Sequence, residues 1–290
     1  MFSRLRKSRR NVCNVMPLVS LREILPEARR RKRAVGAFNV ANYECALGVI
    51  RAAEGEKSPV IIQVFQRLFR SEKGADLAGT LLRMAQRCSQ PVVVHLDHGA
   101  EPSQVRDALA AGLSSVMFDG SKLPFAENAA LTKYAADYAH VVGASCEGEI
   151  GHVAMGDESA ITTVEDAVNF YESTKVDALA VSVGTVHGFY TAEPKIEVGR
   201  CREIADTLPE VPLVLHGGSG TPPQDVRALI ENGVSKINIA TEYMDTFLKS
   251  VKKQLDLLDG KFKPIDLFMD PVVDDCALHV SRLIRFFAGK

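Results

Sequence analysis

The sequence predicts an α/β fold, a (β/α)8 TIM barrel in a single domain with a C-terminal helical extension. Short apolar, β-rich runs alternate with helical patterns along the whole chain, and there are eight such runs. Most of them are nearly continuous in apolar residues, as expected of parallel strands that are covered on both faces. The length of 290 residues also suits one barrel of about 250 residues with an extension. An open, doubly wound sheet is the alternative.

The eight expected strands are short and separated by turn residues or helical segments. They span residues 34–39, 60–64, 92–97, 115–119, 141–147, 178–183, 213–216 and 235–239. Helices are expected between and after them at residues 43–55, 76–88, 103–111, 124–140, 164–173, 224–232 and 242–258. Proline at the start of a helix costs no hydrogen bond, so Pro222 and Pro223 mark the start of the sixth of these helices. Gly112 and Gly233 follow the ends of two helices, where glycine is common. Residues 262–290 are expected to pack further helices against the barrel.

Charge and composition bound the class of protein. Hydrophobic residues make up 46% and charged residues 24%, which excludes a disordered chain or a coiled coil. The net charge of −1 divides into a basic arm at residues 1–15 and a remainder with 30 basic and 36 acidic residues, or −6. We expect the arm to be a disordered extension, with the barrel formed by residues 16–290. The acidic remainder argues against nucleic acid as a partner.

Membrane and redox signals are weak. No run approaches the roughly 18 apolar residues of a membrane span. The 6 cysteines show no regular spacing, which favours a reducing compartment, and we expect the protein in the cytoplasm.

Polar residues gather where the predicted strands end. Active sites of such barrels lie at the C-terminal ends of the strands. In chain order, the residues at or just after these ends include Asn39, Asp97, His98, Asp119, Ser121, Glu147, Glu149, His187, His216, Asn238 and Thr241.

Three histidines occupy corresponding positions in His-Gly pairs at three strand ends. They are His98, His187 and His216. Imidazole is a common zinc ligand, and three protein ligands with one open position are typical of catalytic zinc. A structural role is the alternative for each histidine taken alone, but the repeated position favours a metal site.

Residues 217–220 form a glycine-rich turn after the seventh strand. Small residues there let backbone N–H groups approach an anion. Together with Asn238 and Thr241 after the eighth strand, Gly217 and Ser219 match the common phosphate site of barrels. A tight turn that needs glycine for its backbone alone is the alternative.

Lysine positions bear on a Schiff-base mechanism, which needs a lysine near the end of a barrel strand. Lys236 lies at the start of the last predicted strand, at the wrong end, and Lys122 in a loop is the one exception. The metal route is therefore favoured.

Six motifs in order resemble the class II, metal-dependent ketose-bisphosphate aldolases, which include fructose- and tagatose-bisphosphate enzymes. The motifs are Val35-Gly-Ala-Phe-Asn39, Val94-His-Leu-Asp-His-Gly99, Ser115-Val-Met-Phe-Asp-Gly-Ser121, Gly184-Thr-Val-His-Gly188, Leu215-His-Gly-Gly-Ser-Gly220 and Lys236-Ile-Asn-Ile-Ala-Thr-Glu242. The similarity runs from about Met16 to the C-terminus. It implies a lyase that cleaves a phosphorylated ketose to dihydroxyacetone phosphate and an aldehyde through a metal-stabilised enediolate.

The resemblance also implies residue roles. His98, His187 and His216 would bind zinc with Glu149 as an alternative ligand, and a second monovalent or divalent cation is allowed. Asp97 would exchange a proton with the aldehyde oxygen, and Asp157 or Glu158 would be the base on the loop after the fifth strand. Substrate or its phosphate would contact Asn39, Ser121, Gly188, Gly217, Ser219, Asn238 and Thr241. A homodimer or homotetramer is implied.

Three departures from the family bear on the substrate. Ala240 stands where fructose-bisphosphate members carry Asp, as in tagatose-bisphosphate members. Thr191 replaces a lysine near the phosphate, and residues 65–69 replace a Ser-x-Gly-Ala stretch with a bulky segment that includes Phe65 and Arg67. Arg67 within this segment or Arg70 just after it would supply a different anion contact. These changes favour a tagatose-1,6-bisphosphate-like substrate over fructose 1,6-bisphosphate, or an atypical ketose monophosphate.

Two other functions remain open from the sequence. A metal-dependent sugar-phosphate epimerase or isomerase would use the same enediolate without breaking a carbon–carbon bond. A non-catalytic barrel subunit is the third reading, which the presence of Asp97 and all three histidines argues against.

Overall fold

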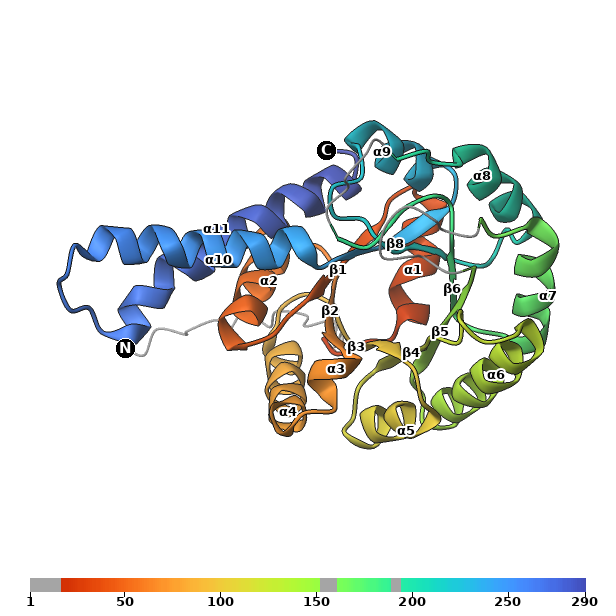
Figure 1. The fold of residues 1–290 in the computed structure, drawn as a ribbon, viewed down its shortest axis with the longest axis horizontal. Helices are drawn as coiled ribbons and strands as arrows, with labels where there is room; N and C mark the ends of the chain where they lie inside the picture. The colour runs from red at the N-terminus through yellow and green to blue at the C-terminus, as the bar shows by residue number, and fades with distance from the viewer. Residues whose placement is uncertain (1–16, 152–160, 189–193) are drawn as a thin grey trace, which may run out of the picture.

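Eight parallel strands close into a barrel, with each strand paired to the next and β8 paired to β1 (Figure 1). The computed structural model describes residues 17–151, 161–188 and 194–290. The strands are β1 (Val35–Asn39), β2 (Val60–Phe65), β3 (Val92–Gly99), β4 (Ser115–Phe118), β5 (Ser145–Ile150), β6 (Ala178–Val181), β7 (Leu213–Leu215) and β8 (Val234–Ile239). The predicted (β/α)8 barrel is confirmed. The basic arm at residues 1–15 and the predicted loop bases Asp157 and Glu158 lie outside the described residues.

The helices alternate with the strands around the outside. They are α1 (Leu21–Arg30), α2 (Tyr43–Glu56), α3 (Gln66–Phe69), α4 (Glu72–Arg87), α5 (Pro102–Ala110), α6 (Phe125–Val141), α7 (Val164–Thr174), α8 (Val198–Thr207), α9 (Pro223–Glu231), α10 (Thr241–Leu258) and α11 (Ile265–Phe287). The seven predicted helices are all present, and α1, α3 and α8 had no predicted range.

The fifth strand begins later than predicted. Val141 ends α6 with 86% of its surface exposed, and Gly143 has a φ of +80° in the turn that follows. The apolar pair at 141–142 therefore belongs to a helix end and a turn, and the strand starts at Ser145.

The interior of the barrel divides into an apolar floor and a polar upper part. Because side chains alternate along a strand, residues two apart share the interior. The floor is formed by small and β-branched side chains such as Val35, Ala37 and Ile61, and α1 covers it with its apolar face. In Figure 1, α1 lies across the ring of strands. A separate and larger apolar core lies between the strands and the outer helices.

The C-terminal extension forms a helical hairpin that projects from the barrel (Figure 1). α11 packs along α2 and α10, and the Phe287 carbonyl at its end accepts a hydrogen bond from the Ala34 N–H at 3.1 Å. The far part of the hairpin leaves the barrel, with Phe262 91% exposed and Ile265 73% exposed. The expectation that residues 262–290 pack against the barrel is therefore correct for the end of α11 and wrong for the hairpin tip.

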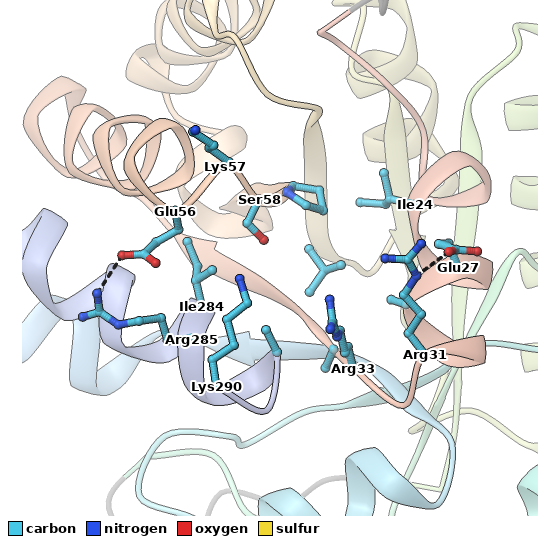
Figure 2. A pocket seen from close by; sticks show the side chains of 15 residues that line it. Ile24, Glu27, Arg31, Arg33, Glu56, Lys57, Ser58, Ile284, Arg285 and Lys290 are labelled. Atoms are coloured by element: carbon cyan, nitrogen blue, oxygen red, sulfur yellow. Dashed lines mark hydrogen bonds and ion pairs between the residues drawn. The ribbon is translucent and has the colours of Figure 1, made fainter.

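A hollow of about 230 Å³ opens at the N-terminal end of the barrel, between α1, the α2–β2 turn and the end of α11. Figure 2 shows basic side chains around it, among them Arg33 and Lys290. Two further cations are paired, since Arg285 lies 2.9 Å from Glu56 and Arg31 lies 2.5 Å from Glu27. This hollow lies at the end of the barrel opposite the predicted site.

Within the described part of the chain, no helix is both long and apolar enough to cross a membrane. The five cysteines of this part are buried thiols without a disulfide.

Candidate active site

The C-terminal mouth of the barrel brings the predicted metal ligands together. His98 lies at the end of β3, His187 follows β6, and His216 follows β7 directly. The ring centroid of His98 lies 5.3 Å from that of His187 and 4.7 Å from that of His216. One ring nitrogen from each of the three histidines lies within 4.8 Å of the others. The side chains therefore converge from three strands on one point.

His98 has an unusual backbone. Its φ is +54°, in the left-handed region, and the pairing of β3 with β4 shifts register between Leu96 and Gly99. Such a conformation costs a non-glycine residue about 1 kcal/mol or more and is concentrated at functional sites. The kink at the strand end turns the imidazole toward the barrel axis, where the other two histidines lie.

A carboxylate orients the ring of His98. Asp119 Oδ2 lies 2.7 Å from His98 Nδ1, so Nδ1 carries the hydrogen and Nε2 is left to face the other histidines. Burial lowers the pKa of His98, but the charges of Asp97 and Asp119 outweigh it, so the pKa lies above its usual value. Asp119 is itself held by the Ser121 hydroxyl, which donates at 2.7 Å, and the pKa of Asp119 is strongly lowered by His98 and Ser121 despite burial. A second group of potential ligands is formed by His98, Asp119 and Glu149, again within 4.8 Å.

His216 is fully buried between two carboxylates. Its Nε2 lies 2.8 Å from Glu147 Oε1 and its Nδ1 lies 3.1 Å from Glu149 Oε2. Burial lowers the pKa of this imidazole, yet the two carboxylates raise it to about 10. Nδ1 makes no well-directed hydrogen bond, so this nitrogen is a candidate metal-ligand atom beside Glu149.

The donor set suits a divalent transition metal. Neutral imidazole and carboxylate are ligands of zinc, and a metal displaces the ligand proton when it binds. Burial, with the neighbouring His216 and His98, lowers the pKa of His187 to about 4, so this imidazole is neutral and ready to coordinate. The buried Nδ1 of His216 and the oriented Nε2 of His98 complete the set. The residues therefore fit a metal.

Asp97 lies beside the histidines at the end of β3, with only 3% of its surface exposed. It accepts hydrogen bonds from Asn39 Nδ2 at 2.7 Å and Asn238 Nδ2 at 3.2 Å. Burial raises the pKa of Asp97, but the charges of His98, Lys236 and His216 outweigh it and hold the pKa below its usual value. The side chain is thus an ionised carboxylate, able to take a proton.

The predicted phosphate cradle lies where β7 and β8 lead into helices. Gly217 has a φ of +66°, and a Cβ there would lie 2.3 Å from the Val186 carbonyl oxygen, so only glycine fits. The Ser219 hydroxyl accepts a hydrogen bond at 3.3 Å from the Glu242 N–H in the first turn of α10. Gly188 also has a positive φ, +96°, with open space where a Cβ would stand. A glycine turn beside a helix N-terminus can bind an anion.

Two predicted substrate residues lie deeper than expected. Asn39 accepts from Gln63 and donates to Asp97, and Asn238 accepts from Lys236 and donates to Asp97. Both amides are therefore part of the hydrogen-bond network that holds Asp97.

Sequence reasoning missed the roles of Asp119, Glu147 and Lys236. The sequence places Lys236 at the end of the barrel away from the site, and this prediction is wrong for its side chain. Its Nζ lies inside the barrel, 2.6 Å from Asn238 Oδ1 and 2.8 Å from Glu147 Oε2. Strand alternation was the available signal. Glu147 lies two residues before Glu149, and Lys236 two before Asn238, so each pair shares one face of its strand.

His95 and Phe65 flank the site. His95 is fully buried two residues before Asp97 on β3, with Nδ1 2.7 Å from Ser115 Oγ. Phe65 is 38% exposed and its ring centroid lies 5.9 Å from that of His98. The replacement segment after β2 continues as α3, and Arg70 at its end is paired with Glu101 at 3.2 Å. Thr191 lies outside the described residues.

A barrel with a buried carboxylate beside three histidines that could hold a metal ion is the arrangement of a metal-dependent enzyme class. Comparison with known sequences specifies which kind. The family described as "Fructose-bisphosphate aldolase class-II" matches residues 19–290. The chain belongs to the class II fructose-bisphosphate aldolase family, and so to the lyases, which confirms the resemblance found in the sequence.

Individual relatives cover most of the chain. A sulfofructosephosphate aldolase from Alkalicoccus urumqiensis is 38% identical over 83% of this chain and 86% of its own length. A 6-phospho-5-dehydro-2-deoxy-D-gluconate aldolase from Bacillus velezensis is 35% identical over 95% of this chain and 98% of its own. The crystal structure of the YdjI aldolase from Escherichia coli K12 superposes with a TM-score of 0.83 at 33% identity, covering 93% of this chain and 97% of that one.

Proposed function

We propose that this protein is a zinc-dependent aldolase that reversibly cleaves a phosphorylated ketose to dihydroxyacetone phosphate and an aldehyde. The observation that supports it most is the convergence of His98, His187 and His216 beside Glu149 and the ionised Asp97. This arrangement offers a metal site and a proton acceptor at the mouth where barrel enzymes bind substrates.

Each group has a distinct task in this proposal. Bound zinc supplies a Lewis acid that stabilises negative charge as it develops on substrate oxygens. Glu149 is an alternative ligand beside His216. In cleavage, Asp97 accepts the proton of the hydroxyl that becomes the aldehyde, and in the reverse direction it returns that proton. Proton exchange at the carbon of dihydroxyacetone phosphate falls to Asp157 or Glu158.

The rest of the site holds the substrate. Gly217, Ser219 and Gly188, with Thr241 at the start of α10, bind the phosphate through backbone N–H groups and hydroxyls. Asn39 and Asn238 each donate one amide hydrogen to Asp97, and the second amide hydrogen is the group that would bind a substrate hydroxyl or phosphate oxygen. Ser121 supports the site through Asp119.

We propose a tagatose-1,6-bisphosphate-like substrate in preference to fructose 1,6-bisphosphate. Ala240, the residue before α10, supports this because it cannot form the charged contacts of an aspartate. Phe65 supports an altered aldehyde end, since its partly exposed ring lies beside His98. The two named relatives act on a sulfofructose phosphate and a deoxygluconate phosphate, so phosphorylated substrates with different distal groups occur among similar chains. An atypical ketose monophosphate is the variant of this proposal.

Cytoplasmic location and assembly into a dimer or tetramer belong to the same proposal. Buried, reduced cysteines are compatible with the first. The exposed apolar side chains on the α10–α11 hairpin are compatible with the second.

A substrate panel tests the proposal. Purified protein is given fructose 1,6-bisphosphate, tagatose 1,6-bisphosphate, fructose 1-phosphate and 6-sulfofructose 1-phosphate, and triose phosphate release is followed with a coupling enzyme. We expect release from at least one ketose, faster from tagatose than from fructose bisphosphate, with activity lost in chelator and restored by zinc. Activity that chelator does not reduce would refute the metal dependence. Faster cleavage of fructose 1,6-bisphosphate would refute the preference for tagatose 1,6-bisphosphate.

A further inference from the structure

A buried lysine and a buried glutamate face each other inside the barrel, below the three histidines. Lys236 comes from β8 and Glu147 from β5, and Nζ lies 2.8 Å from Oε2. Both side chains are 0% exposed. Burying two charges is costly and is repaid only when the geometry is good and further hydrogen bonds are made. A pair at this place therefore calls for a reason beyond stability.

The pair connects the two halves of the site. On the lysine side, Nζ donates at 2.6 Å to Asn238, whose amide donates at 3.2 Å to Asp97. On the glutamate side, Oε1 accepts from His216 Nε2 at 2.8 Å. One ammonium thus links the carboxylate that moves a proton with an imidazole that binds the metal.

Lys236 decides which way these neighbours point. An ammonium has only donors, so the Asn238 oxygen must turn toward it and the Asn238 NH2 toward Asp97. Glu147 is held by Lys236 at one oxygen and so presents the other to His216 Nε2. That contact fixes a hydrogen on Nε2, so Nδ1, which lies 3.1 Å from Glu149 Oε2, is the nitrogen left for a metal that displaces its proton. Partners that orient a ligating histidine in this way strongly affect metal affinity.

We propose that Lys236 is a positioning residue that prepares the site for its metal by orienting Glu147, and through it His216. The inference rests on the proposed metal role of the three histidines. It gives Lys236 a role without any covalent step, since an ammonium that is hydrogen-bonded to Asn238 and ion-paired with Glu147 has no lone pair with which to attack a carbonyl.

Zinc affinity of three variants tests this, measured by competition with a chromophoric chelator on the full chain. Lys236→Met keeps the stem and removes the charge, Glu147→Gln keeps the shape and an acceptor oxygen, and the third variant combines them. We expect zinc affinity to fall about 10–100-fold in Lys236→Met. Because the lysine acts through the glutamate, the double variant should bind zinc no more weakly than Glu147→Gln alone.

A matched control separates positioning from general damage. Asp177 is also buried, 8% exposed, and is paired with His140 at 2.9 Å outside the barrel. Asp177→Asn should lower the unfolding temperature while leaving zinc affinity within about twofold of wild type.

The outcomes are distinct. Unchanged zinc affinity in Lys236→Met, or a double variant that loses a further tenfold beyond Glu147→Gln, overturns the positioning role. If Lys236→Met does not fold, the comparison of Glu147→Gln with the double variant decides alone. The double variant carries no charge at either position, and Glu147→Gln leaves only the Lys236 ammonium, which still donates to Asn238. A wild-type protein that binds no zinc instead refutes the proposed function.

Discussion

Replacing Asp97 by alanine tests the proton acceptor most directly. The side chain is 3% exposed and accepts two amide hydrogen bonds, at 2.7 Å from Asn39 and 3.2 Å from Asn238. A positioned acid–base group contributes about 10²–10⁴-fold to the rate. At about 1.4 kcal/mol for each factor of ten, its removal should raise the barrier by about 3–5 kcal/mol.

Asp97→Ala changes the free energy of unfolding in two opposite directions. Alanine leaves the Asn39 and Asn238 amides without their acceptor, at about 1–3 kcal/mol each. Removing a buried carboxylate recovers part of its desolvation cost. Asp97→Asn is the matched variant, because it keeps the volume and one acceptor oxygen but cannot take up the proton. Both variants should keep their zinc, since the three histidines and Glu149 are unchanged.

Three measurements check this prediction. Triose phosphate release should fall about 10²–10⁴-fold in both variants, whereas zinc content stays near wild type. Proton exchange on dihydroxyacetone phosphate should persist, because that step does not involve the aldehyde oxygen. Turnover within tenfold of wild type in Asp97→Asn would show that the residue only holds its neighbours. Loss of zinc together with turnover would show that it supports the metal instead.

Three further predictions concern the surroundings of the site. Asp119→Asn should weaken zinc binding about 10–100-fold by releasing His98 Nδ1, which chelator competition would detect; unchanged affinity would contradict the orienting role. Burial and the charge of a neighbouring lysine lower the pKa of His95 to about 3. Below about pH 6.5 the unfolded chain therefore binds a proton that the folded chain does not. The free energy of unfolding should fall as the pH drops from 6.5 toward 3, by up to about 1.4 kcal/mol per pH unit. Denaturant unfolding of the metal-free protein should show a shallower decline in His95→Gln, and parallel curves would contradict it. Gly217→Ala should disrupt the cradle, since its Cβ would lie 2.3 Å from the Val186 carbonyl oxygen at a φ of +66°; a normal KM for the phosphorylated substrate would argue against the cradle.

The sequence predicts the barrel well because each strand is a separate run of apolar residues. It misplaces the start of β5, since Val141 and Val142 are as apolar as strand residues although they end a helix. The three clustered histidines are predictable because each precedes a glycine at or after the end of a strand. Nothing in the local pattern reveals the φ of +54° at His98, which depends on the register shift between β3 and β4.

The polar network below the site is harder to predict, because it joins side chains from strands far apart in the chain. A lysine near the start of a strand usually lies at the N-terminal end of the barrel, away from the active site. Only the closed barrel shows that the stem of Lys236 runs inside and brings its ammonium to Glu147. The loop carrying Asp157 and Glu158 lies outside the described residues, so the choice between them stays a prediction.

The Lys236–Glu147 pair joins two segments of the chain that are synthesised at different times. Glu147 leaves the ribosome with β5, and its cation follows only with β8, on the order of 10 s later at usual rates of synthesis. Before β8 is in place, Glu147 has no lysine partner, and burying its charge alone would cost several kcal/mol. Because β8 also closes the ring between β7 and β1, closure of the barrel and neutralisation of its interior charge depend on the same strand.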